Sequence, residues 1–338
     1  MKVAIVVLAV VLLVGGIAVV QKRQARLNPA PENGGAGVIK GESTPGEVAS
    51  TRQFTIGSGE YTYTLTVDGK DRQYMAFVPA SYDKKTKTPL VMFYHGGGGS
   101  MDQAARDYDM KAKASKEGFI VVFGNGASRF PRGKLATWNA GDCCGYARDT
   151  KSDDVGYTRE VIADMESKFF IDTEKIFATG MSNGGMMAHR LACEMSDVFK
   201  AVASVTGTDG TLSCDPKQPI SVMHIHAKDD DHVLIGGGAG SESFGDMGEK
   251  VADFTSVADT IARWVTRNHM DGTPKRVLEV PGAYCDLYTS SQNQSQVKLC
   301  ITDTGGHSWP GGPAVRGKTP SQVLSANDVI WDFFKSQK

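Results

Sequence analysis

Ser182 has the surroundings of a reactive side chain. It stands in Gly180-Met181-Ser182-Asn183-Gly184, directly after the apolar, strand-like residues 176–179 and directly before a helical pattern at 186–195. Glycines on both sides of a serine allow a strand to turn sharply into a helix, which leaves the hydroxyl exposed. The start of that helix favours negative charge, and the Asn183 amide could donate to an oxyanion. We therefore expect Ser182 to act as a nucleophile, the alternative being a glycine-rich helix start without chemistry.

A serine nucleophile needs a general base and a carboxylate that orients the base. His307 is the expected base, because glycines at 305, 306, 311 and 312 indicate a shaped loop late in the chain. Asp230 is the expected carboxylate, since it lies four residues after His226 in the turn that ends a strand-like run. The aspartates at 229 and 231 are expected to be solvated loop charges.

The same turn also has the ingredients of a metal site. His224 and His226 share one face of a strand-like run and are followed by the three aspartates at 229–231. Histidine and carboxylate side chains are common ligands of transition metals. Two histidines on one strand more often pack or line a substrate site, so we expect neither a metal nor another cofactor.

A run of glycines precedes the nucleophile in the chain. His95-Gly96-Gly97-Gly98-Gly99 follows the apolar residues 89–94, which is the position of a second oxyanion donor. We expect the amide of Gly97 to act together with that of Asn183. A phosphate-binding loop is excluded because no Gly-Lys-Ser/Thr follows. His95, Trp138 and Trp309 are expected to contact the substrate, and Trp309 could form the wall of an acyl or aromatic pocket.

Strand-like and helix-like patterns alternate along the chain, which indicates a mostly parallel, doubly wound α/β sheet. The order serine, aspartate, histidine is that of the α/β-hydrolase fold. We find no internal repeat and expect a single catalytic domain over residues 54–338. The expected strands lie at 61–67, 73–78, 89–94, 119–123, 176–179, 201–205 and 220–226, with a pair within 276–303, and the expected helices at 101–117, 153–169, 186–195, 256–269 and 321–335.

The N-terminus indicates export. Residues 3–20 are uninterruptedly apolar, and their length is borderline between a signal peptide and a membrane anchor. Cleavage after Ala18 fits the first reading, whereas the basic residues at 22, 23 and 26 favour the second. We expect residues 1–26 to be one or the other, 27–53 to be a flexible linker, and the protein to be secreted or periplasmic. Membrane contact is then limited to residues 3–20 if they are uncleaved. The net charge of −1 gives no reason to expect a nucleic-acid partner.

Six cysteines, an even number, fit an oxidising compartment. Cys285 and Cys300 flank two strand-like runs, so a bridge across a hairpin is expected there. Cys193 and Cys214 could form a second bridge. The adjacent pair at 143 and 144 could bridge each other or reach elsewhere.

Several segments together resemble the poly(3-hydroxybutyrate) depolymerase / feruloyl esterase family of secreted α/β-hydrolases, similar to carbohydrate esterase family 1. The resemblance covers about residues 60–335. It is carried by Leu90-Val91-Met92-Phe93-Tyr94-His95-Gly96-Gly97-Gly98-Gly99, Trp138-Asn139-Ala140-Gly141, Cys143-Cys144-Gly145, Asp153-Asp154-Val155-Gly156, Gly180-Met181-Ser182-Asn183-Gly184-Gly185 and Gly306-His307-Ser308-Trp309-Pro310-Gly311.

The resemblance implies hydrolysis of carboxylic esters, with Ser182, Asp230 and His307 as the catalytic triad. The family's turn commonly reads His-Gly-Thr-x-Asp, whereas this chain has His226-Ala227-Lys228-Asp229-Asp230. We see no separate polymer-binding domain, which favours soluble substrates: short hydroxyalkanoate esters or oligomers, or feruloyl or acetyl esters of plant polysaccharide. Two alternatives stay open: a non-catalytic envelope or carbohydrate-binding module with a vestigial site, and a peptidase of the same fold.

Overall fold

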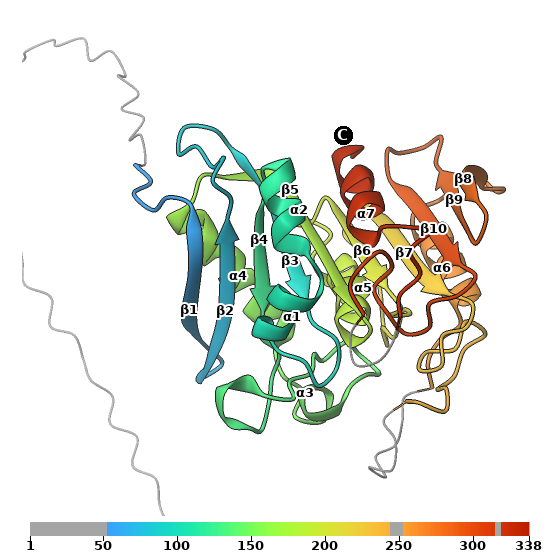
Figure 1. Ribbon diagram of the computed structural model, residues 1–338, viewed down its shortest axis with the longest axis horizontal. Helices are drawn as coiled ribbons and strands as arrows, with labels where there is room; N and C mark the ends of the chain where they lie inside the picture. The colour runs from blue at the N-terminus through green and yellow to red at the C-terminus, as the bar shows by residue number, and fades with distance from the viewer. Residues whose placement is uncertain (1–52, 244–252, 315–318, 338) are drawn as a thin grey trace, which may run out of the picture. The chain divides into compact units, whose positions relative to one another are not determined.

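A ten-stranded sheet forms the centre of the structure, in the order β1-β2-β4-β3-β5-β6-β7-β10-β9-β8 (Figure 1). The computed structural model describes residues 53–243, 253–314 and 319–337. The expected export segment 1–26 and the expected linker up to residue 52 lie outside the described residues. Within the described residues, none of the helices combines the length and the apolar character needed to span a bilayer.

The strands agree closely with the alternating pattern of the sequence. Their bounds are β1 Gly59–Val67, β2 Lys70–Val78, β3 Thr88–Tyr94, β4 Ile120–Gly124, β5 Ile171–Met181, β6 Ala201–Val205, β7 Ser221–Ala227, β8 Lys275–Val280, β9 Ala283–Thr289 and β10 Gln296–Thr302. The six central strands, from β4 to β10, are parallel, and an antiparallel pair closes each edge. The continuous apolar runs of β4, β6 and β7 are buried throughout, as expected of strands covered on both faces.

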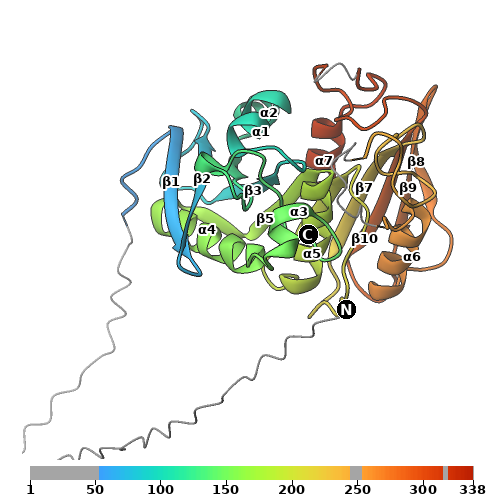
Figure 2. The same ribbon diagram turned by 90° about the horizontal axis from the view of Figure 1, so that it is seen from below.

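Helices cover both faces of the sheet, which confirms the predicted doubly wound α/β arrangement. They are α1 Met101–Asp107, α2 Met110–Glu117, α3 Gly145–Asp149, α4 Asp154–Lys168, α5 Asn183–Glu194, α6 Val257–Arg267 and α7 Ala326–Lys335. Residues of α1, α2 and α7 pack in one apolar cluster, and residues of α4, α5 and α6 pack in the other. Figure 2 shows these two layers on opposite sides of the sheet.

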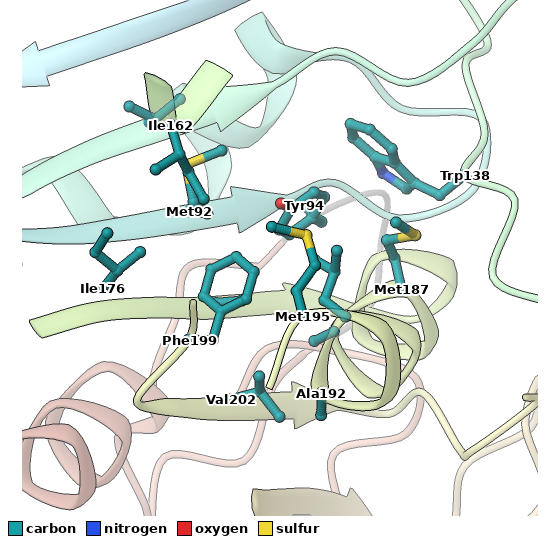
Figure 3. Packing of buried hydrophobic residues seen from close by; sticks show 14 of the residues in the cluster. Met92, Tyr94, Trp138, Ile162, Ile176, Met187, Ala192, Met195, Phe199 and Val202 are labelled. Atoms are coloured by element: carbon teal, nitrogen blue, oxygen red, sulfur yellow. The ribbon is translucent and has the colours of Figure 1, made fainter. Parts of the chain in front are cut away.

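The core beneath α5 holds the turn after β5 in place. Tyr94 and Trp138 lie edge to face, with ring centroids 4.9 Å apart, and both side chains are fully buried. Met187 and Met195 of the α5 region and Phe199 join the same cluster (Figure 3). Deep burial of large side chains on this scale makes the position of α5 rigid. The residue that precedes α5 is therefore held on a fixed support.

Two segments differ from the expectation. The predicted helix 101–117 is broken into α1 and α2, because Asp109 has a left-handed backbone (φ 56°) and Tyr108 turns inward to pack against Phe93 and Trp309. The segment 276–303 forms three strands and not two, since a turn with Gly282 at φ 89° separates β8 from β9.

The structure pairs all six cysteines: Cys143 with Cys144, Cys193 with Cys214, and Cys285 with Cys300. Cys285 and Cys300 stand directly opposite each other on the antiparallel strands β9 and β10, with Cα atoms 4.1 Å apart. The structure thus places a bridge at the expected hairpin. It joins the strand that leads into the loop of His307 to its outer neighbour.

Candidate active site

Ser182 occupies the sharp turn between β5 and α5. Its backbone has φ 55° and ψ −123°, a conformation that L-residues adopt only when their surroundings enforce it. Close backbone packing on both sides of Ser182 enforces this conformation. A Cβ on Gly180 would lie 2.5 Å from the Tyr94 carbonyl oxygen, and a Cβ on Gly184 would lie 2.5 Å from the His95 carbonyl oxygen. Only glycine fits these two positions. This strained strand–turn–helix geometry is the one that the sequence pattern predicted.

Asp230 and His307 meet although 77 residues separate them in the chain. The Nδ1 atom of His307 lies 2.9 Å from Oδ2 and 3.1 Å from Oδ1 of Asp230. The backbone amides of His232 and Val233 donate to Oδ1 at 2.9 Å and 3.0 Å. The sequence-based choice of Asp230 among three neighbouring aspartates thus agrees with the geometry.

The Asp230 carboxyl is ionised in this setting. Its side chain is fully buried, and burial by itself raises its pKa. The hydrogen bond from His307 and the positive charge of its protonated form, with smaller contributions from His226 and the His232 amide, outweigh burial and hold the pKa of Asp230 below its usual value. An ionised Asp230 fixes the proton of His307 on Nδ1. The other ring nitrogen, Nε2, is then the one available to accept a proton from Ser182.

Asp229 is exposed and Asp231 is partly exposed, as expected of loop charges, but each also makes a defined contact. Asp229 accepts from the backbone amides of Gly306 at 2.8 Å and Gly305 at 3.3 Å, so it holds the loop that carries His307. Asp231 lies 2.7 Å from Nδ1 of His232. The Asp229 contact joins segments 77 residues apart, which no local pattern reveals, whereas Asp231 contacts its neighbour in sequence.

Ser182 and His307 line the same pocket, whose volume is about 360 Å³. Gly97 and Trp309 line it as well, with Tyr108 and Phe254 among the apolar walls. Trp309 packs against Phe93 and Tyr108, and its indole donates to Asn327 at 3.0 Å. Trp309 thus lines the pocket that Ser182 also lines, and Tyr108 is a further wall residue that the prediction of one continuous helix over 101–117 did not reveal.

His95 and Trp138 lie elsewhere than expected. Both side chains are completely buried, so neither is placed to contact the substrate directly. The Trp138 indole donates to the His95 carbonyl at 3.0 Å, and the Trp138 backbone exchanges hydrogen bonds with the Asn183 side chain at 2.7 Å and 2.9 Å. These residues tie the glycine loop to the start of α5, the two segments expected to supply oxyanion donors.

The imidazole of His95 is neutral. It donates from Nδ1 to the Gly96 carbonyl at 2.8 Å and accepts at Nε2 from the Gly126 amide at 3.0 Å. Burial lowers its pKa to about 4. The amides of Gly98 and Gly99 already donate to carbonyl groups, at 2.8 Å and 3.0 Å. This leaves the Gly97 amide as the better candidate for an oxyanion donor on this loop.

His232 is a site residue that the sequence did not single out. Its ring stacks on that of His307, with centroids 4.5 Å apart and planes at 7°, and it lines the same pocket. Burial and the nearby charge of His307 lower its pKa. Only its place two residues after Asp230 could have drawn attention to it.

Asp230, His232 and His307 could offer ligand atoms within 4.8 Å of one another. A metal needs lone pairs that converge, and the in-plane lone pairs of two parallel rings do not. The other candidate pair, His224 and His226, has its ring nitrogens engaged in hydrogen bonds among histidines and with the Val233 carbonyl. The described side chains therefore favour acid–base chemistry over metal binding at this site.

Comparison with known proteins agrees with the geometry. The sequence profile of the family described as "Esterase PHB depolymerase" matches residues 73–263. Feruloyl esterase B of Piromyces equi is 30% identical over 242 residues, which cover 70% of this chain and 42% of that protein. The chain thus spans less than half of that relative. Putative esterase NocK of Nocardia uniformis subsp. tsuyamanensis is 28% identical over 284 residues, 79% of this chain and 80% of its own length.

Solved structures share the fold at low sequence identity. Acetyl xylan esterase from Aspergillus awamori superposes with a TM-score of 0.53 at 15% identity, covering 81% of this chain and 99% of that one. An S-formylglutathione hydrolase from Agrobacterium tumefaciens gives a TM-score of 0.53 at 12% identity, covering 84% and 97%. The architecture that both share with the described residues is the α/β-hydrolase fold.

Proposed function

The chain belongs to the esterase PHB depolymerase family, and we propose that it is a carboxylic-ester hydrolase that cleaves its substrate through Ser182, Asp230 and His307. The observation that carries the proposal is the double contact of the buried Asp230 with Nδ1 of His307, beside a pocket that Ser182 also lines. This arrangement supports a base with a defined tautomer and a strained, partly exposed serine at one pocket.

The proposed reaction has two halves. His307 takes the proton from the Ser182 hydroxyl as its oxygen attacks the ester carbonyl, and the amides of Gly97 and Asn183 stabilise the oxyanion. The protonated His307 then donates to the departing alkoxide, which leaves an acyl group on Ser182. Water, activated by His307, attacks that acyl group and releases the acid. Asp230 stays ionised throughout and stabilises the imidazolium that forms in each half.

The pocket supports an ester with a compact acyl or aromatic group. Aromatic walls at Tyr108, Phe254 and Trp309 suit a planar ring, and several relatives are named feruloyl esterases. We propose feruloyl or acetyl esters of plant polysaccharide, or short hydroxyalkanoate esters and oligomers, as substrates. Three disulfides support a secreted or periplasmic location.

A hydrolysis panel tests this proposal. Methyl ferulate, p-nitrophenyl acetate and hydroxybutyrate oligomers are compared with the parent enzyme and with Ser182→Ala as the matched control. We expect turnover of at least one ester by the parent and its loss in the variant. A folded parent that hydrolyses none of them would favour a binding module with a vestigial site. Cleavage of peptides in place of esters would favour a peptidase.

A further inference from the structure

Three histidines form a continuous buried file beneath the proposed active site. His189 of α5 and His224 and His226 of β7 are all 0% exposed. His189 Nε2 lies 3.4 Å from His224 Nδ1, and His224 Nε2 lies 3.1 Å from His226 Nδ1. The rings within each pair are close to parallel, at 27° and 13°. The proposed mechanism uses none of these imidazoles.

An indole at one end and a backbone carbonyl at the other set the direction of the hydrogen bonds in the file. Trp264 of α6 places its Nε1 2.9 Å from Nδ1 of His189. An indole nitrogen can only donate, so His189 accepts at Nδ1 and carries its proton on Nε2. At the other end, the Val233 carbonyl can only accept, so His226 donates from Nε2 and its Nδ1 accepts from His224. The Nδ1 atom of His224 then accepts from His189, whose Nε2 proton is also shared with the backbone of Gly207. All three imidazoles thus carry their proton on Nε2.

The far end of the file reaches the turn that holds the acid of the triad. His226 Nε2 lies 2.8 Å from the Val233 carbonyl oxygen and 3.5 Å from Oδ2 of Asp230. The amides of Val233 and His232 donate to the other carboxylate oxygen of Asp230. The Nε2–H of His226 thus holds the Val233 carbonyl in place. Through Val233 it also holds the backbone amides that donate to the Asp230 carboxylate.

The file is suited to hold a position and not to carry protons. A second proton on any of the three rings would set N–H against N–H, or against the Trp264 indole, and would break a link. Burial lowers the pKa of all three imidazoles, to about 4 for His189. The file also ends at a buried donor, because Trp264 is 0% exposed and its indole N–H cannot accept a proton from His189.

We propose that Trp264, His189, His224 and His226 form a tautomer-locked file whose function is to position Asp230 for the orientation of His307. This inference rests on the proposed serine triad. His226 is the positioning residue that contacts the turn, and Trp264 fixes the direction of the file from the opposite end.

Kinetics of His226→Leu and His226→Gln test the contact itself. Leucine removes the donor, and we expect kcat to fall about 10- to 100-fold with little change in KM, since a small displacement of a catalytic group costs this much. Glutamine can offer an amide N–H at the position of Nε2, so it should recover most of the lost turnover. Assays are run well below each variant's melting temperature.

Trp264→Phe tests the file from its remote end, with Trp331→Phe as the matched control. Trp331 is also a buried indole donor, 2.8 Å from Glu117, but it lies on α7 on the other face of the sheet. We expect Trp264→Phe to lower kcat and to move the ¹⁵N shifts of His189. Trp331→Phe should change neither, although it also loses a hydrogen bond. This pair decides the question if His226→Leu does not fold.

The ¹⁵N spectra of the parent protein report the tautomer and the protonation state of each imidazole independently of activity. All three imidazoles should be neutral and protonated on Nε2 between pH 6 and 8. A proton on Nδ1 of His226, or a kcat for His226→Leu and Trp264→Phe equal to that of the parent, would overturn the proposal. Ser182→Ala distinguishes a failure of the proposed triad from a failure of the proposed file. If Ser182→Ala stays active, the triad is wrong. If Ser182→Ala is inactive while His226→Leu is fully active, the file only stabilises the fold.

Discussion

Acidification should destabilise this protein through its buried histidines well before its carboxylates are protonated. His95 and His189 are both completely buried, and burial lowers the pKa of each to about 4. In the unfolded chain a histidine has a pKa of about 6.5. Between these two values the unfolded state binds a proton that the folded state does not. The stabilisation is therefore complete above about pH 6.5 and is lost progressively as the pH falls towards 4.

The size of the effect follows from the difference in pKa. At pH 5 each of these two histidines is expected to lower the free energy of unfolding by about 2 kcal/mol, hence about 4 kcal/mol for both. His224 and His226, whose pKa values are also lowered by burial, act in the same direction. For a folded unit of about 290 residues, 4 kcal/mol corresponds to a decrease in Tm of about 7 °C. Asp230 has a lowered pKa and loses its contribution only at lower pH.

Guanidinium unfolding at several values between pH 7.5 and 5 measures this dependence. Near pH 5.5 the free energy of unfolding should change by at least about 2 kcal/mol per pH unit. His189→Phe should reduce that slope by about one proton, because it removes a fully buried imidazole whose pKa is lowered to about 4. A free energy of unfolding that is the same at pH 7.5 and 5, or an equal slope in His189→Phe, would refute the reasoning.

Three further predictions concern the active site and its support. Asp230→Asn should lower kcat by about 10⁴-fold, because it removes the charge that fixes the His307 tautomer, while Asp229→Asn should cost far less; a larger loss in Asp229→Asn would reassign the acid. Hydrolysis should be unaffected by EDTA, and loss of activity with recovery on adding zinc would contradict the proposed mechanism. In Cys285→Ser/Cys300→Ser the free energy of unfolding should fall by about 3 kcal/mol, because the bridge closes a 15-residue loop, and Tm measured by calorimetry should fall by about 5 °C. The value of kcat should be retained, because β10 also pairs with β7. A loss of kcat well below the melting temperature would show that the bridge positions the His307 loop.

The features that the sequence predicted well are those that local backbone chemistry determines. Gly180 and Gly184 are required by close approach of neighbouring backbone, so the turn at Ser182 could be recognised without knowing what packs on it. Buried parallel strands have continuous apolar runs, which is why β4, β6 and β7 were predicted almost to their observed bounds. Asp230 followed from its spacing after a strand.

The features that the sequence missed depend on contacts between distant segments. The break between α1 and α2 arises because Tyr108 finds Phe93 and Trp309, neither of which is its neighbour in sequence. The support that Asp229 gives to the His307 loop is likewise a contact across more than 70 residues. Trp138 shows the same limit, because its motif is recognisable but its burial is set by packing in three dimensions.

Covalent labelling of Ser182 tests the central claim most directly. The parent enzyme is treated with a fluorophosphonate and digested, and the modified peptide is sequenced by mass spectrometry. The proposed mechanism predicts one adduct, on Ser182, with loss of ester hydrolysis in proportion to labelling and no adduct in Ser182→Ala. A stoichiometric adduct on another serine, or full hydrolytic activity in Ser182→Ala, would contradict it.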